Sequence, residues 1–125
     1  VHGSPRKNNE DILPDTPLSE VEKMLENVDA DVVLCGHTHI PCGFQTESRK
    51  TVVNAGSIGR TFFVEPNSYP KACYLIIEVD NGSCVFQHQF VEYDKEQASE
   101  KLAAREFEGA DKLAGMLINP EIRHF

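Results

Sequence analysis

The stretch Asp31–Pro41, DVVLCGHTHIP, runs four apolar residues into a glycine and then places two histidines one residue apart. A short apolar run that ends at a glycine is typical of a strand covered on both faces, so residues 31–35 are predicted to form one. His37 and His39 would point the same way if the strand continued through both. A turn after Gly36 would instead aim both rings at one region beyond the carboxyl end of the strand, which is where open α/β sheets bind ligands.

The chemistry of two neighbouring imidazoles favours metal binding at this strand end. Imidazole is the commonest metal ligand among side chains, and two metal ions about 3.5 to 4 Å apart can each take one histidine. His37 and His39 are therefore candidate metal ligands, and the alternative is that they are surface or hydrogen-bonded histidines in a turn. His2 also follows an apolar residue and precedes a glycine. His2 is therefore a third candidate metal ligand, and a shared site would require that both strand ends point into one pocket.

The residues on either side predict a helix and two short strands. Ser19 and Glu22 have the spacing of a capping box at a helix start. The apolar stripe of this helix would consist of Val21, Met24, Leu25 and Val28. Two short strands are expected at 44–46 and 51–54, around a polar turn.

The second half of the chain predicts a hairpin followed by helices. Asn-Gly at 81–82 favours a tight turn between strands at 72–79 and 84–91, because both residues accept positive φ. Asp94 can cap the helix that follows, and Pro120 would close a last short helix.

The composition is that of one ordinary globular domain. The 125 residues include 40% hydrophobic and 26% charged residues, and a chain of this length buries roughly two thirds of its unfolded surface. The net charge of −8, without a lysine or arginine cluster, disfavours binding to long nucleic acids. No apolar run in the sequence approaches the length of a membrane span, so no membrane partner is expected.

The cysteines indicate a reducing compartment. None of the four shows C-x-x-C spacing, and three fall in or beside strand-like runs. We therefore expect reduced core thiols in a cytoplasmic protein rather than a zinc ribbon. Cys35, next to the candidate site, has no basic neighbour in the sequence and is interpreted as a core thiol.

Three segments, in order, carry a family resemblance. VHGSPR (1–6), CGHTHIP (35–41) and VVNAGSIGR (52–60) together resemble the C-terminal half of the calcineurin-like metallophosphoesterases, in their small bacterial and archaeal phosphodiesterase-like branch. The resemblance covers about residues 1–92, and its most specific part is G-H-x-H followed by an NPGS-like loop. Ala55 stands where family members often carry proline.

This resemblance implies a fold, an activity and a ligand set. The fold would be α/β (α+β), the C-terminal half of a four-layer αββα sandwich with mixed β-sheets. The activity would be that of a hydrolase, a phosphodiesterase or phosphatase in which two divalent ions activate a hydroxide for attack on a phosphate ester. The matching positions assign His2 and His37 to one ion and His39 to the other. Mn²⁺, Fe²⁺, Ni²⁺ or Zn²⁺ would suit such ligands.

The family motifs D-x-H, G-D-x-x-D and G-N-H-[DE] do not occur in this sequence. In the family they precede the segment matched by His2, and they supply the bridging aspartate, an asparagine ligand and a histidine that assists phosphate. We therefore expect residues 1–125 to be a single domain, the C-terminal portion of a phosphoesterase whose N-terminal portion is missing. The catalytic residues would lie in that portion, and the fragment alone is expected to be inactive.

A half-fold of this kind predicts exposed apolar surface. Residues 51–91 are expected to form one sheet that is largely intact, with only the edge of the other sheet present. The uncovered face would pack against a second polypeptide, which would be the missing N-terminal half or another copy of the chain.

Several polar residues near these motifs are further candidates. Arg60, after the GSIG loop, could bind a substrate phosphate through a bidentate pair, and Arg6 is similar; the alternative for both is a solvated loop arginine. Thr38 and Asn54 are expected to hydrogen-bond the backbone or to orient imidazoles. His88 is interpreted as a core or interface histidine.

The alternative function is a non-catalytic protein-interaction scaffold on the same fold. Two features favour it: the ligand set is incomplete, and the apolar loop TFFVE at 61–65 could form a contact patch. The residues upstream of Val1 would discriminate, because an enzyme needs the D-x-H and G-N-H-[DE] motifs there.

Overall fold

The computed structural model describes residues 1–62 and 71–120 and is a mixed α/β structure, as the sequence predicts. Its helices and strands, in chain order, are α1 (Leu18–Met24), β1 (Val32–Cys35), β2 (Cys42–Gln45), β3 (Thr51–Asn54), β4 (Ala72–Asp80), β5 (Ser83–Val91), α2 (Lys95–Ala103) and α3 (Ala110–Ile118). None of the helices in these two ranges is long and apolar enough to cross a membrane. Residues 63–65 of the predicted contact patch lie outside the described residues.

A three-stranded sheet contains the strand that precedes the two histidines. Its order is β1-β3-β2, with β1 parallel and β2 antiparallel to β3. In this register Cys35 and Cys42 flank Asn54 on its two sides. The predicted strands before Gly36 and before Ala55 are confirmed, whereas the strand predicted at 44–46 begins earlier, at Cys42.

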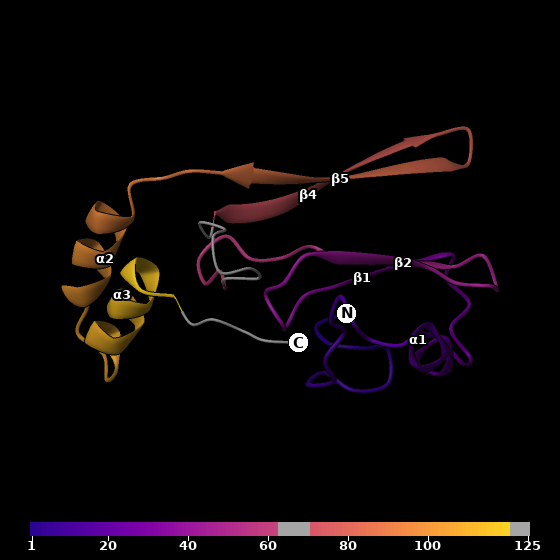
Figure 1. Ribbon diagram of the computed structural model, residues 1–125, viewed down its shortest axis with the longest axis horizontal. Helices are drawn as coiled ribbons and strands as arrows, with labels where there is room; N and C mark the ends of the chain where they lie inside the picture. Colours follow the sequence, from indigo (N-terminus) through magenta and orange to yellow (C-terminus); the bar gives the residue numbers. More distant parts are fainter. Residues whose placement is uncertain (63–70, 121–125) are drawn as a thin grey trace.

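Helix α1 covers one face of this sheet (Figure 1). The predicted apolar stripe is confirmed by the buried residues Val21, Met24 and Leu25. The predicted capping box is wrong, because Pro17 occupies the N-cap position and no side chain caps the helix start. The Glu22 carboxylate instead accepts hydrogen bonds from the backbone N–H groups of Glu47 (2.6 Å) and Ser48 (3.4 Å), which ties α1 to the turn between β2 and β3.

The main hydrophobic core lies between α1 and the sheet. Its buried members are Ile12, Val21, Met24, Leu25, Val33, Cys35 and Val52. The expectation that the strand at 31–35 is covered on both faces is wrong at Leu34, which is 40% exposed. The reason is that β1 is an edge strand, whereas the central strand β3 buries Val52, Val53 and Asn54 in succession.

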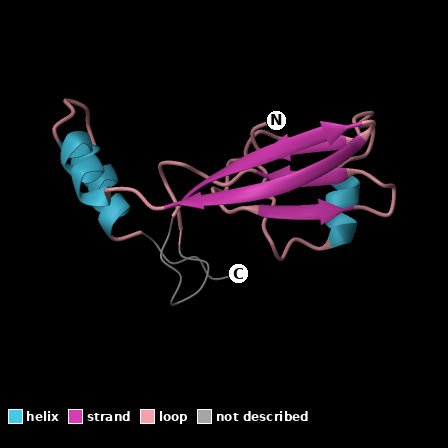
Figure 2. Cartoon of the chain, turned by 90° about the horizontal axis from the view of Figure 1, so that it is seen from above, coloured by secondary structure: helices cyan, strands magenta, loops and turns pink. Residues whose placement is uncertain are grey.

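Strands β4 and β5 form a separate antiparallel hairpin on the other face of the sheet (Figures 1 and 2). Asn81 and Gly82 in its turn have φ values of 46° and 81°, which confirms the Asn-Gly prediction. The expectation that residues 51–91 form one sheet is wrong. Both edges of β3 are paired, with β1 and with β2, while β4 pairs only with β5, so the hairpin forms a second sheet.

The hairpin exposes apolar side chains on one of its faces. In the β4–β5 register the exposed residues on this face include Tyr74, Ile76, Val85 and Val91. His88 lies on the opposite face and contacts the three-stranded sheet. The expected exposed apolar surface is therefore present, whereas its cover by a second polypeptide stays a prediction.

Helices α2 and α3 pack against each other beyond the ends of the two sheets (Figure 1). The predicted cap is confirmed, because the Asp94 carboxylate accepts a hydrogen bond of 2.8 Å from the backbone N–H of Gln97. Ala110 and Ala114 are buried at the contact, and the Ser99 hydroxyl donates to the Ala114 carbonyl at 2.9 Å. The two helices thus form a unit that follows β5 in the chain.

Candidate metal centre

The first two residues lie along the free edge of β1. The amino group of Val1 donates to the carbonyl of Leu34 at 3.0 Å, and the backbone N–H of Gly36 donates to the carbonyl of His2 at 2.8 Å. This pairing places His2 beside the carboxyl end of β1. His2 and the GHTH segment therefore meet at one sheet edge, as the two strand-end motifs predict.

The rings of His2 and His37 are in contact. His2 Nε2 lies 3.0 Å from His37 Nδ1, and the ring centroids are 4.9 Å apart in an edge-on arrangement. A carboxylate also lies here, because Asp11 Oδ1 is 3.3 Å from His37 Nε2. Sequence reasoning missed Asp11, whose only signal is its place in a polar connection. Two imidazoles and one carboxylate thus gather at the end of β1.

Left-handed backbone conformations direct the two histidines of the GHTH segment. His37 has φ 64° and His39 has φ 63°, while Gly36 has no positive φ. The turn predicted at Gly36 is therefore made by the histidines themselves. A non-glycine residue in this region costs of order 1 kcal/mol or more and persists only where its surroundings hold it. Two such residues, one position apart, indicate a segment that is held in place.

Asn54 supplies that hold from the end of β3. Its buried side-chain amide donates to the Gly36 carbonyl at 2.7 Å and to the Thr38 hydroxyl at 2.9 Å. Its Oδ1 accepts from the backbone N–H of Gly56 at 3.0 Å. Asn54 thus bonds on both sides of His37 and to the following glycine loop. These bonds agree with the expectation that Thr38 and Asn54 make backbone contacts.

His39 turns toward the loop that follows β3. Its Nδ1 lies 2.8 Å from the Arg60 carbonyl oxygen and must carry the proton, since a carbonyl can only accept. The lone pair of His39 is then on Nε2, the nitrogen that could bind a metal. The Arg60 guanidinium lies over the ring of Phe62, with 5.3 Å between its carbon and the ring centroid. Its predicted role with phosphate stays a prediction.

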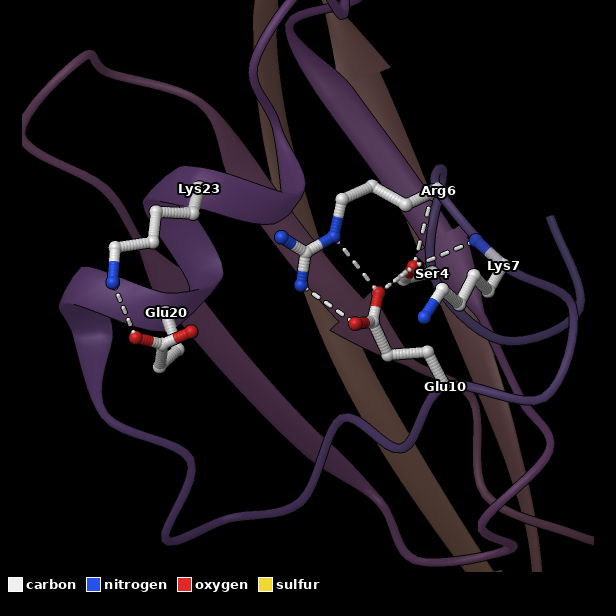
Figure 3. A network of polar contacts seen from close by, with 6 residues as sticks. All are labelled: Ser4, Arg6, Lys7, Glu10, Glu20 and Lys23. Carbon is white, nitrogen blue, oxygen red and sulfur yellow. Dashed lines mark hydrogen bonds and ion pairs between the residues drawn. The ribbon is translucent and has the colours of Figure 1, made fainter.

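The loop after His2 is closed by its own polar network (Figure 3). The Arg6 guanidinium forms an ion pair of 2.6 Å with Glu10, and the buried Ser4 hydroxyl donates to the same carboxylate. These hydrogen bonds, from Arg6 first and then from Ser4, lower the pKa of Glu10. A Cβ on Gly3 would meet the Asn8 carbonyl oxygen at 2.6 Å, so this loop requires glycine there. Arg6 therefore serves the loop structure.

The thiol next to the site lies in the core. Burial raises the pKa of Cys35 from 9.0 to about 11, and burial with the nearby Cys35 raises the pKa of Cys42 to about 12. Both thiols therefore stay protonated near neutral pH. This agrees with the interpretation of Cys35 as a core thiol.

The described residues do not by themselves complete a metal site. Within 1–62 and 71–120, no group of three or more His, Cys, Asp or Glu side chains is placed so that it could hold an ion. The structure brings His2 and His37 together and directs His39 to Arg60. Because His39 is two residues from His37, their Cα atoms are no more than about 7 Å apart. The convergence of all three on paired ions stays a prediction.

Comparisons with known proteins identify the family and the fold. A family model described as the calcineurin-like phosphoesterase superfamily domain matches residues 1–82. The crystal structure of a metallophosphoesterase from Sphaerobacter thermophilus is similar in fold, with a TM-score of 0.65 and 20% sequence identity. The match covers 94% of this chain and 54% of that one, so the chain spans about half the length of that structure. No curated protein matches the chain.

Proposed function

Because this chain belongs to the calcineurin-like phosphoesterase superfamily, we propose that its protein hydrolyses a phosphate ester with two divalent metal ions. His2 and His37 would hold one ion and His39 the other. Membership supports a phosphoesterase-type function, and the paired-ion mechanism is our proposal. The organic product would leave as an alcohol, and the phosphate would gain the oxygen of water.

One observation carries the ligand assignment. Two ligand nitrogens, each about 2.0 to 2.1 Å from one ion at an angle of about 90° to 109°, are roughly 2.9 to 3.4 Å apart. His2 Nε2 and His37 Nδ1 are 3.0 Å apart. This distance is that of a hydrogen bond between the two rings, and because it also equals the spacing of two ligands of a single ion, it supports the assignment. Asp11 contacts the opposite nitrogen of His37, Nε2, so it would orient this ring rather than bind the same ion. Mn²⁺, Fe²⁺, Ni²⁺ or Zn²⁺ would be the ion.

The metal ions, when bound, would neutralise phosphate charge and lower the pKa of a bound water. The chain's own residues prepare the site for them. The bond from His39 Nδ1 to the Arg60 carbonyl fixes the orientation of that ring and leaves the lone pair on Nε2, and Asn54 fixes the backbone on both sides of His37. Arg60 lies in the loop whose backbone bonds to His39, and its guanidinium could bind a phosphate oxygen of the substrate.

We further propose that the remaining ligands come from a segment of the full-length protein outside residues 1–125. The described residues supply no group of three ligands, and the chain spans about half of the Sphaerobacter structure. Residues 1–125 alone would then be inactive. The four free cysteines, of which Cys35 and Cys73 are buried, support a cytoplasmic location.

The test is hydrolysis of bis(4-nitrophenyl) phosphate by the full-length protein, with Mn²⁺, Ni²⁺ or Zn²⁺ added after chelation. We expect turnover only with metal, and a loss of about 100-fold or more in kcat/KM for His37→Ala, beyond the effect of removing a residue that merely orients a ligand. Gln45→Ala, at an exposed position at the end of β2, is the control and should keep full activity. Unchanged turnover in His37→Ala would reject the proposal.

The scaffold function has one observation in its favour. The hairpin exposes Tyr74, Ile76, Val85 and Val91 on a single face, which is the kind of surface that binds another protein. The same assay separates the two functions. A full-length protein that shows no metal-dependent turnover, and no metal binding in equilibrium dialysis, would support the scaffold.

A further inference from the structure

Two adjoining hollows open beside His39. The near hollow, of about 290 Å³, is lined on one side by His39, Ser57, Gly59 and Arg60. Its other side comes from the helical unit and consists of Leu102, Leu113, Met116 and Leu117. The side chains of α2 and α3 thus form an apolar wall facing the candidate metal ligand and the candidate phosphate ligand.

The far hollow continues away from the site. It has a volume of about 510 Å³ and shares Gly59 and Leu117 with the near hollow. Its other lining residues include Ile58, Ala72, Tyr74 and Val91. Together the two hollows form an apolar groove whose polar end is at His39 and Arg60.

The charge pattern of this groove selects one kind of ligand. Among the lining residues that the structure describes, Arg60 is the only one with a permanent charge. A phosphate group would find its partners at the polar end. Further along, the side chains of the described lining residues offer only the hydroxyls of Tyr74 and Tyr93 for hydrogen bonding. A sugar or nucleoside would therefore leave most of its hydroxyl and amide groups without partners, which is costly in apolar surroundings. An apolar chain would instead gain from burial along the whole groove.

We propose that the organic group of the substrate is a long apolar group, such as an alkyl chain, that lies in this groove with its phosphate at His39 and Arg60. This inference rests on the proposed function and adds the substrate class to it. The helical unit α2–α3 would then be a specificity element, since it supplies the wall opposite the metal ligands. The continuity of the groove with the candidate site is the observation that favours a substrate as occupant.

The test compares two 4-nitrophenyl phosphodiesters that differ only in their second ester group, methyl or octyl. With the full-length protein and Mn²⁺, kcat/KM for the octyl ester should exceed that for the methyl ester by about tenfold or more, because each buried methylene adds to binding. Gly59→Phe places a ring where the hollows meet. A Cβ at Gly59 meets no atom within 4 Å, so the backbone accepts the change. In this variant the ratio of kcat/KM for the octyl ester to kcat/KM for the methyl ester should fall to about one.

Gly115→Phe is the matched control. It lies on α3, its Cβ also meets no atom within 4 Å, and it lines neither hollow. The octyl preference should survive this substitution. Equal kcat/KM for the two esters in the wild type, or a preference that survives Gly59→Phe, would overturn the proposal.

A binding measurement separates this proposal from the proposed function. Calorimetric titration with octylphosphonate and methylphosphonate needs no turnover. Tighter binding of octylphosphonate than of methylphosphonate, abolished by Gly59→Phe, would support the groove even if neither ester is hydrolysed. The absence of hydrolysis would then reject only the phosphoesterase activity. Equal affinity for both phosphonates, with normal hydrolysis of the methyl ester, would reject the groove and leave the phosphoesterase activity standing.

Discussion

His88 Nε2, on the inner face of the hairpin, lies 2.7 Å from the main-chain carbonyl oxygen of Asn54 at the end of β3. Since the carbonyl only accepts, Nε2 carries the proton and donates it. The side chain of Asn54 in turn bonds to Gly36 and Thr38. One residue of the three-stranded sheet therefore connects the second sheet to the segment that carries His37 and His39.

The first prediction concerns this connection. His88→Leu removes the donor and should lower the free energy of unfolding by about 1 to 2 kcal/mol, while His88→Gln, which keeps an N–H donor, should recover part of the loss. Urea denaturation measures both variants. Gln87→Leu, at the exposed neighbouring position on the outer face of β5, is the control and should change stability by less than about 0.5 kcal/mol. An equal loss in the Leu and Gln variants of His88 would contradict a role for the hydrogen bond.

The second prediction concerns Asn54 itself. Asn54→Ala removes the amide that donates to the buried Thr38 hydroxyl and to the Gly36 carbonyl, so the free energy of unfolding should fall by about 2 to 3 kcal/mol. Metal affinity of the full-length protein should fall by about 10- to 100-fold, because the backbone on both sides of His37 is released. Calorimetric titration with Mn²⁺ measures this effect. Asn9→Ala, at an exposed loop position, should change neither quantity, and an unaltered Mn²⁺ affinity in Asn54→Ala would count against the positioning role.

The third prediction separates the two metal ions. If His2 and His37 share one ion, then His2→Ala, His37→Ala and their combination should each leave about one ion per full-length chain of the two expected. His37→Ala combined with His39→Ala should leave none. Elemental analysis after dialysis gives these stoichiometries, with Gln45→Ala as the control that keeps both ions. The shared-ion assignment fails if the His2/His37 double variant loses both.

The fourth prediction follows from the buried thiols. Burial raises the pKa of Cys35 from 9.0 to about 11 and that of Cys42 to about 12 in the folded protein. Above pH 9 the unfolded chain therefore releases protons that the folded chain retains, and the free energy of unfolding should fall as pH rises from about 9 towards 11. Each such thiol contributes at most about 1.4 kcal/mol per pH unit. Denaturation of Cys42→Ala should show a shallower fall with pH, whereas the exposed Cys84→Ala should not.

Local patterns predicted the elements that depend on local chemistry. Asn81-Gly82 gave the hairpin turn and Asp94 gave the start of α2, because each acts within a few residues of the chain. The capping box at Ser19 failed for the opposite reason. The Glu22 carboxylate bonds to the distant turn at 47–48, which no local pattern reveals.

The candidate site was predicted in part. The sequence pointed to His2 and His37 as strand-end residues, and they lie with 3.0 Å between ring nitrogens. It pointed to a glycine turn, but the positive φ values belong to His37 and His39. The sequence did not point to Asp11, because this residue lies in an irregular segment that only the tertiary fold brings against His37.

The sequence by itself determined the family, through three short motifs whose residue types are set by chemistry at strand ends. The tertiary structure alone decided which sheet receives each strand: β1 and β2 pair with β3, while β4 and β5 pair only with each other. It also decided that α2 and α3 face His39 across an apolar groove. Hydrogen bonds and side-chain contacts between residues distant in the chain depend on three-dimensional proximity, and a linear pattern does not contain that proximity.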